Sequence, residues 1–466
     1  MLRGVGPIVS VACLGGLLFG YDTAVISGTV AALEAQFVAP RGLAVDQANS
    51  LLGFAVGAAL IGCVIGGVLA GFMSHRLGRR GSLRICAVLF ALSAIGSAYP
   101  ELLRGSANAA TLWWFIGWRI LGGIGVGIAS MLSPMYIAEI SPPARRGQLV
   151  AYNQIAIVTG MVVVYFVNYA IARLGDDAWN LEIGWRYMFL SEVLPAVAFF
   201  VLLLFVPESP RWLVGAGREA EARGVLERLH GAGDHIARET TAIVASLRET
   251  TSGLFAFGVL LIVMGIVLSV FQQFVGINVV LYYAPEIFKD LGAGTNAAML
   301  QTVLVGVVNV AFTVVAILCV DGWGRRPLLI LGALGMAAAM FGLGTVLYLD
   351  VSGVAALLCM LLYIAMFALS WGPVVWVLLS EMFPNSIRAK AMAIAVAAQW
   401  LSNYLVSSTF PVLNNNPELV ARFNHGFAYW LYGAMALLAA LIIWRWLPET
   451  RGVALEDMPE RWHGGS

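Results

Sequence analysis

The sequence predicts an all-α membrane protein of twelve transmembrane helices, arranged as two six-helix bundles with short cytoplasmic helices between them. Composition, the number of apolar runs and an internal repeat predict this fold. Of the 466 residues, 60% are hydrophobic and only 11% are charged, whereas soluble domains carry about a quarter charged residues. Most of the surface must therefore face the lipid bilayer. The net charge of +1 gives no indication of a nucleic-acid partner.

Apolar runs of spanning length set the domain organisation, because a transmembrane helix needs about 20 mostly apolar residues. The runs lie at 7–30, 48–73, 83–100, 111–138, 148–172, 185–206, 254–284, 299–320, 327–349, 354–380, 388–413 and 426–447. They predict an N-terminal bundle (1–206), a cytoplasmic linker (207–253), a C-terminal bundle (254–447) and a cytoplasmic tail (448–466). Helical spacing from Arg218 to Leu229 predicts short surface helices in the linker.

Lysine and arginine gather in the loops on one side of the predicted spans, which makes that side cytoplasmic. An even number of spans puts both termini there as well. The chain has no N-x-Ser/Thr sequon, which favours a bacterial inner membrane over a glycosylated cell surface. We expect a multi-pass protein of that membrane, functioning as a monomer.

Several other kinds of site are excluded by spacing. The five cysteines lie in apolar runs without a CxxC pair, so we expect free thiols. The five histidines show no metal-ligand spacing, and there is no Walker or Ser-His-Asp arrangement, so we expect no metal, no cofactor and no enzyme. The glycine run 122–127 lacks GxGxxG spacing, and Gly123 with Gly127 predicts a close helix contact instead.

An internal repeat divides the chain into related halves. Gly78-Arg79-Arg80 recurs as Gly324-Arg325-Arg326, and Pro207-Glu208-Ser209 recurs as Pro448-Glu449-Thr450, at a nearly constant offset. Glu139 and Arg146 recur as Glu381 and Arg388. Such duplicated halves are typical of transporters that rock two bundles about a central site. Cross-half ion pairs would close the cytoplasmic face in one state; the alternative is that the arginines only set topology. The expected gate residues are Arg79, Arg80, Glu139, Arg146, Glu208, Asp321, Arg325, Arg326, Glu381 and Arg388.

Through these motifs, the sequence resembles the sugar porter branch of the major facilitator superfamily over essentially its whole length. The motifs also include Gln-Gln-Phe-Val-Gly-Ile-Asn at 272–278 and Pro-Glu-Thr-Arg-Gly at 448–452. Stretches such as Gly15 to Gly28 and Phe271 to Pro285 are most similar to the bacterial D-xylose/proton symporters. The resemblance implies two six-helix bundles around a central sugar site and import of a monosaccharide, D-xylose in the first place, with a proton.

Two ionisable residues stand out in the middle of spans, Asp22 in the first and Arg119 in the fourth. Charged groups there are costly and mark pathways by default. Burial raises a carboxylate pKa and a neighbouring arginine lowers it, so helix movement can couple proton and sugar binding. A purely structural buried pair is the alternative. The resemblance favours coupling, because family symporters have their proton-coupling aspartate at the position of Asp22 and uniporters have asparagine.

Amide and aromatic side chains in the spans form the expected sugar site. Amides can both donate to and accept from sugar hydroxyls without the cost of burying a charge. A single amide could equally hold helices together, but the set matches the family's sugar-binding positions. Near Gly276 we expect the helix to loosen. The expected sugar-binding residues are Gln154, Gln272, Gln273, Asn278, Asn309, Trp376 and Gln399. The expected lining residues are Phe19, Met161, Tyr282 and Trp400.

Two positions depart from the family pattern. His75 stands where many members have an aspartate, while the second half keeps Asp321. Met161 stands where the xylose symporters have glutamine, which leaves glucose or another aldose as an alternative substrate. A facilitative uniporter is the second function, and Asp22 argues against it. A non-transporting sugar sensor is the third; sensors usually have long cytoplasmic tails, and only 448–466 follows the last span.

Overall fold

The computed structural model describes residues 4–102, 111–142, 145–231, 233–247, 253–255, 258–350, 353–383 and 385–449. At 234, 235, 246, 247, 321, 380, 381, 385, 386, 388 and 389 it describes the backbone only. Helices form most of these ranges, and no strand occurs within them. The fold is therefore all-α, as the composition predicts.

A helix occupies the position of every predicted span. The spans correspond in order to α1 (Val5–Val25), two parts of α3 (Val45–Ala98), α4 (Leu112–Ile140), α5 (Arg146–Ala172), α7 (Trp185–Leu190) with α8 (Val193–Leu202), α12 (Val259–Phe274) with α13 (Ile277–Asp290), α14 (Thr295–Trp323), α15 (Arg325–Tyr348), α16 (Gly353–Leu369) with α17 (Trp371–Met382), α18 (Asn385–Asn415) and α20 (Phe427–Trp446). The remaining short helices are α2 (Val30–Leu33), α6 (Asp177–Trp179), α9 (Pro210–Gly215), α10 (Glu219–His230), α11 (Asp234–Leu247) and α19 (Pro417–Phe423).

Ten helical segments of the described chain are long and apolar enough to cross a membrane. One of them is α3, which contains two predicted spans separated by a kink at Gly78, where φ is 74°. The predicted span 388–413 corresponds to α18, which is not one of these ten segments. Helix α18 is more polar because it carries amide side chains such as Gln399 and Asn403. Polar groups at this depth are tolerated where they face a cavity instead of lipid.

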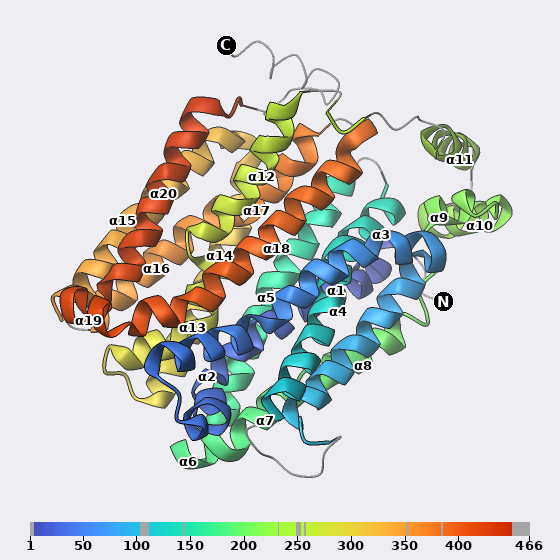
Figure 1. Ribbon diagram of the computed structural model, residues 1–466. Coiled ribbons are helices and arrows are strands. Elements are labelled where there is room, and N and C mark those ends of the chain that lie inside the picture. The colour runs from blue at the N-terminus through green and yellow to red at the C-terminus, as the bar shows by residue number, and fades with distance from the viewer. Residues whose placement is uncertain are drawn as a thin grey trace.

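Helices of the first half, blue to green in Figure 1, pack beside helices of the second half, yellow to red. The halves meet where α18 packs on α3 and where α14 packs on α5. Within the first half, α4 lies very close to α3. A Cβ atom on Gly123 would lie 1.8 Å from the Ala59 carbonyl oxygen, and one on Gly127 would lie 2.3 Å from that of Cys63. The close helix contact predicted from these two glycines is confirmed.

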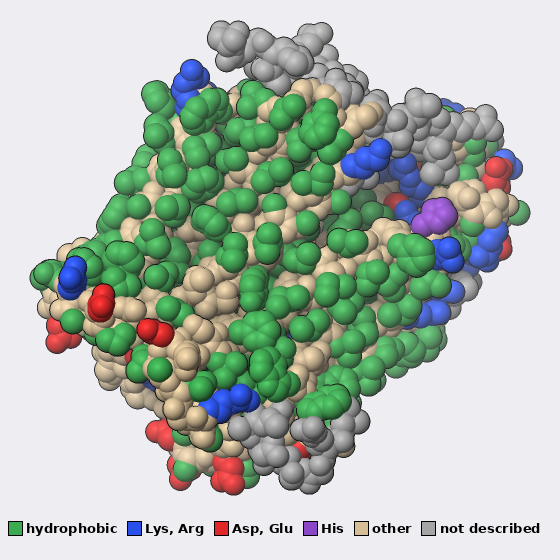
Figure 2. All heavy atoms as spheres, in the orientation of Figure 1, with side chains coloured by type: hydrophobic (Ala, Val, Ile, Leu, Met, Phe, Trp, Pro, Cys, Tyr) green, Lys and Arg blue, Asp and Glu red, His purple; other side chains and the backbone are tan. Residues whose placement is uncertain are grey.

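The linker between the halves forms the short helices α9, α10 and α11, so the prediction of surface helices there is correct (Figure 1). His230 at the end of α10 contacts both Glu239 of α11 and the Ile140 carbonyl at the end of α4. Figure 2 shows hydrophobic side chains covering the middle of this face, with lysine and arginine gathered mostly toward the α9–α10 end. On this face of the molecule, an apolar belt therefore lies beside a basic end.

Candidate functional site: a central amide cavity and a buried ion pair

A cavity of about 100 Å³ lies between the two halves. Helices α1 and α5 form one wall, and α12, α13, α14, α17 and α18 form most of the other. All the sequence-predicted sugar-binding and lining residues border this cavity: Phe19, Gln154, Met161, Gln272, Gln273, Asn278, Tyr282, Asn309, Trp376, Gln399 and Trp400. The structure thus brings together residues that are spread over most of the sequence.

Four amides of the second half form one hydrogen-bonded network, in which Gln273 Nε2 donates to Gln272 Oε1 at 3.4 Å. Gln399 Nε2 donates to Gln272 Oε1 at 2.5 Å, and Asn278 Nδ2 donates to Gln273 Oε1 at 2.5 Å. Gln272 Nε2 in turn donates to the Trp371 carbonyl oxygen at 2.8 Å. Each side chain is therefore held in place before any ligand arrives, and preorganised groups lose less entropy on binding.

A helix break allows these amides to converge. Helix α12 ends at Phe274 and α13 begins at Ile277, with Gly276 between them at φ 90°. A side chain at 276 would be strained at this φ and would collide with the Tyr432 ring. The predicted loosening near Gly276 is confirmed, and it permits Gln273 and Asn278 to meet although regular helical spacing would separate them.

Aromatic rings and unpaired polar atoms complete the cavity. Phe19 and Trp400 have ring centroids 5.5 Å apart, one contributed by each half. Among the described residues, Gln399 Oε1 and Trp400 Nε1 are buried without a hydrogen-bond partner. Buried polar groups are normally satisfied, so this acceptor and this donor are available to a ligand. Apolar ring faces beside donors and acceptors suit a sugar.

Some lining residues were missed by the sequence reasoning, most clearly Thr23 and Asn403. Thr23 follows Phe19 by four residues, and Asn403 follows Gln399 by four. Residues four apart share a helix face, so this spacing could have identified both.

Asp22 and Arg119 form the ion pair that their positions predict. Arg119 Nη1 lies 2.7 Å from Asp22 Oδ1, and Arg119 Nη2 donates to the Asp22 carbonyl oxygen at 3.0 Å. The side chains are 0% and 1% exposed. Because Thr23 borders the cavity and Asp22 is its neighbour on α1, this pair lies next to the amide site along the chain.

A third buried ionisable residue corrects the expectation of only two. Glu192, between α7 and α8, is 0% exposed and adjoins Asp22. Neither Glu192 oxygen nor Asp22 Oδ2 accepts a hydrogen bond from the described residues. The signal was present in the sequence, since Glu192 is an ionisable residue inside the predicted span 185–206.

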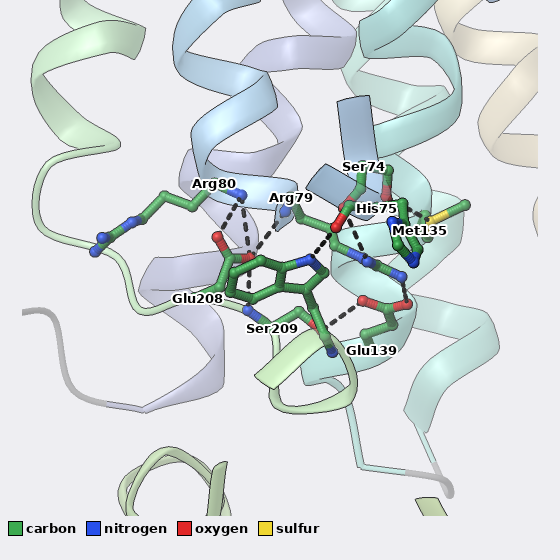
Figure 3. Close-up of polar contacts among 9 residues, drawn as sticks. Ser74, His75, Arg79, Arg80, Met135, Glu139, Glu208 and Ser209 are labelled. Atoms are coloured by element: carbon green, nitrogen blue, oxygen red, sulfur yellow. Dashed lines mark hydrogen bonds and ion pairs between the residues drawn. The ribbon is translucent and has the colours of Figure 1, made fainter. Parts of the chain in front are cut away.

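The Gly-Arg-Arg loop of the first half holds a carboxylate network (Figure 3). Arg79 Nη2 lies 2.6 Å from Glu139 Oε1, and Ser209 Oγ donates to Glu139 Oε2. Glu208 accepts from the backbone N–H groups of Arg79 at 2.9 Å and Arg80 at 3.2 Å. Glu208 thus caps the helix that restarts after Gly78, where anions are stabilised.

The second half repeats this cap. Glu449 accepts from the backbone N–H groups of Arg325 and Arg326, each at 3.0 Å. Gly324 has φ 90°, matching the positive φ of Gly78. The repeat in the sequence therefore corresponds to a repeated structure, in which a glutamate caps the helix that begins at the two arginines.

The cross-half ion pairs expected at the cytoplasmic gate remain a prediction. Among the described side chains, the ion pair between Arg79 and Glu139 lies within one half. Arg146 is exposed at the start of α5. The side chains of Asp321, Glu381 and Arg388 lie outside the described residues.

Comparison with known proteins identifies the family of the chain. Residues 8–462 match the family described as "Sugar (and other) transporter". The chain is 57% identical to the D-xylose-proton symporter of Escherichia coli (strain K12), covering 98% of this chain and 95% of that protein. It is 46% identical to the glucose facilitated diffusion protein of Zymomonas mobilis, covering 98% and 97%.

Solved structures show the same fold. A partially occluded inward-open conformation of the E. coli xylose transporter XylE matches with a TM-score of 0.89 at 54% identity, covering 97% of this chain and 99% of that one. The proton:xylose symporter XylE bound to 6-bromo-6-deoxy-D-glucose matches with a TM-score of 0.84 at 56% identity, covering 98% and 99%. The chain therefore belongs to the sugar transporter family of the major facilitator superfamily, and it is a multi-pass membrane protein with the twelve-helix fold of a transporter.

Proposed function

We propose that this protein imports a monosaccharide together with a proton by alternating access, and that the sugar is D-xylose. The observation that carries the proposal is the combination of an amide-lined cavity with an adjoining buried cluster of Asp22, Arg119 and Glu192. The relatives named above as xylose-proton symporters support both the sugar and the proton.

In this proposal, the amide network binds the sugar hydroxyls. Gln272, Gln273, Asn278 and Gln399 remain neutral over the whole physiological pH range and offer both donors and acceptors. Sugar affinity is then set by hydrogen bonds that are preorganised in the protein. Phe19 and Trp400 pack on the apolar C–H faces of the ring.

The proton binds at the carboxylates. Asp22 and Glu192 are neighbours, and each has a carboxylate oxygen that accepts no hydrogen bond from the described residues. A proton shared by the two carboxylates supplies the missing hydrogen-bond donor. Arg119 balances the remaining charge of Asp22. Because Phe19 and Thr23 of α1 border the sugar cavity, movement of α1 on sugar binding changes the surroundings of Asp22. Such coupling is reciprocal, so protonation must also change sugar affinity.

The orientation follows from charge. The arginine-rich loops and α9–α11 lie on the cytoplasmic side of a bacterial inner membrane, with both termini on that side. The similarity to an inward-open relative supports a cavity that opens toward the cytoplasm after the outer side closes. The protein functions as a monomer, since the cavity is completed by the two halves of a single chain.

A facilitative uniporter is the second candidate, favoured by the 46% identity to a glucose facilitated diffusion protein. Uptake by the purified protein in liposomes, with and without an imposed proton gradient, separates the two. A symporter concentrates sugar inside when the outside is acidic, whereas a uniporter only equilibrates it. A panel of pentoses and hexoses then ranks D-xylose against D-glucose, and equal sugar levels on both sides at steady state would exclude symport.

A further inference from the structure

Two arginines of α3, which follow the kink at Gly78, extend toward the end of α8. Arg80 Nη1 donates to the Val206 carbonyl oxygen at 3.0 Å, and Arg84 Nη2 donates to the Leu203 carbonyl oxygen at 3.1 Å. Figure 3 shows the Arg80 side chain directed away from the network of Glu139 and Glu208. Both guanidinium groups are partly exposed beside the last turn of α8.

The positive charge of these arginines is not matched by acids. Among the described residues, no carboxylate forms an ion pair with Arg80 or Arg84, although Glu208 is close enough to act on Arg84 electrostatically. The Glu208 oxygens are occupied by backbone N–H groups of Arg79, Arg80 and Ser209. Like charges four residues apart on a helix repel each other, and a helix C-terminus supplies only about half a negative charge.

One guanidinium nitrogen is also unsatisfied. Arg84 Nε is buried and has no hydrogen-bond partner among the described residues. A guanidinium has five donors in a planar fork, and each of these two side chains uses one for a carbonyl. The remaining Nη donors of these two partly exposed side chains suit a phosphate, which arginine binds with two parallel hydrogen bonds.

An apolar surface continues from the arginines along the two helices. Val88 and Leu92 follow Arg84 at intervals of four on the same face of α3, and they are 43% and 45% exposed. On α8 and directly after it, Val201, Leu204 and Phe205 are similarly exposed. Because α3 and α8 pack together, a charged head and an apolar chain can bind side by side here.

We propose that Arg80 and Arg84 bind the headgroup phosphate of an anionic phospholipid, whose acyl chains lie against the exposed faces of α3 and α8. The corresponding place in the second half lacks this pair. Arg326 donates to the carbonyl oxygen of Trp444, which is the repeat equivalent of Leu203, and Ile330 stands where the first half has Arg84. The site is thus specific to the first half. The proposal does not depend on which sugar is carried.

The test is lipid binding by the purified full-length protein in detergent, measured by native mass spectrometry with phosphatidylglycerol and, separately, zwitterionic phosphatidylcholine. We expect the protein to bind phosphatidylglycerol preferentially. Arg84→Gln should weaken that binding roughly tenfold, as expected for loss of a charge-assisted hydrogen bond, and Arg84→Lys should weaken it less. Arg422→Gln removes an exposed charge from α19, at the far end of the molecule, and should leave binding unchanged.

Retained sugar binding by each variant shows that it is folded. Equal binding of the two lipids by the parent protein would overturn the proposal, as would an Arg84→Gln affinity equal to that of the parent. Competition by millimolar inorganic phosphate as effective as that by the lipid would identify a free anion site instead. A dimer that covers this face and is lost in Arg84→Gln would identify a protein interface, and would also overturn the proposal.

Discussion

The two halves of this transporter contribute different chemistry to its centre. The first half buries ionisable groups, Asp22, Arg119 and Glu192, and gives the cavity an apolar wall that includes Phe19 and Met161. The second half supplies a network of neutral amides. Gln154 of α5 is an exception, since it adds an amide from the first half. The buried ionisable groups and the cavity amides are therefore largely separated, and each set can be altered without removing the other.

The ends of the two halves have diverged much less. In both, a glycine with positive φ precedes two arginines whose backbone N–H groups bind a glutamate, Glu208 or Glu449. A cap of this kind depends on backbone geometry that any duplicated helix pair needs. The side chains at the centre carry no such constraint. Duplication thus preserved the two Gly-Arg-Arg loops, while the centres of the two halves diverged.

The largest effect is expected from removing the central cation. Arg119→Gln leaves Asp22 and Glu192 buried together without a counter-charge, which should destabilise the fold by about 3–5 kcal/mol. Thermal unfolding in detergent measures this. The exposed pair of Arg218 and Glu221 provides the control, since Arg218→Gln should not measurably change the midpoint. Equal midpoints for Arg119→Gln and the parent would mean that the carboxylates are neutral in the folded protein.

A smaller effect is expected in the second half. Gln272→Ala removes the amide that connects Gln399 with the Trp371 carbonyl, which should cost about 1–3 kcal/mol or roughly 5- to 150-fold in sugar affinity. The sugar transport that remains in Gln272→Ala should still be coupled to protons. Gln301→Ala in α14 removes an amide that does not border the cavity and serves as the matched control. Unchanged affinity in Gln272→Ala would remove this residue from the sugar site.

The smallest effect concerns the apolar wall of the first half. Met161→Gln introduces the amide found in the xylose symporters that the chain resembles, beside the cavity. One neutral hydrogen bond contributes about 0.5–1.5 kcal/mol, so D-xylose affinity should rise by no more than about tenfold. Binding titrations with D-xylose and D-glucose measure the change. A loss of affinity for both sugars would show that Met161 is needed for packing.

The number and length of the helices could be predicted from the sequence, because bilayer thickness sets the length of a spanning helix. The division into two related halves could be predicted from the internal repeat. The cavity residues could be predicted because amides are rare in apolar spans. Glu192 could have been identified as an ionisable residue inside a predicted span, but its place beside Asp22 depends on the packing of α7 and α8. The role of Glu208 was also hidden, because a side chain that binds backbone N–H groups leaves no pairing pattern in the sequence. Arg80 was expected at the gate, and its contact with the Val206 carbonyl after the end of α8 depends on tertiary structure alone.

The central claim is that protons act at Asp22 while sugar binds elsewhere, and Asp22→Asn tests it most directly. The substitution mimics the protonated side chain and leaves the amide network intact, so sugar binding and sugar exchange between equilibrated liposome compartments should persist. Accumulation driven by an imposed proton gradient should vanish. Arg119 then lacks its partner and can slow the cycle, so the decisive quantity is the steady-state ratio of internal to external sugar instead of the rate. We predict a ratio of about one for Asp22→Asn at any pH gradient; a ratio that still rises with the gradient would contradict the account.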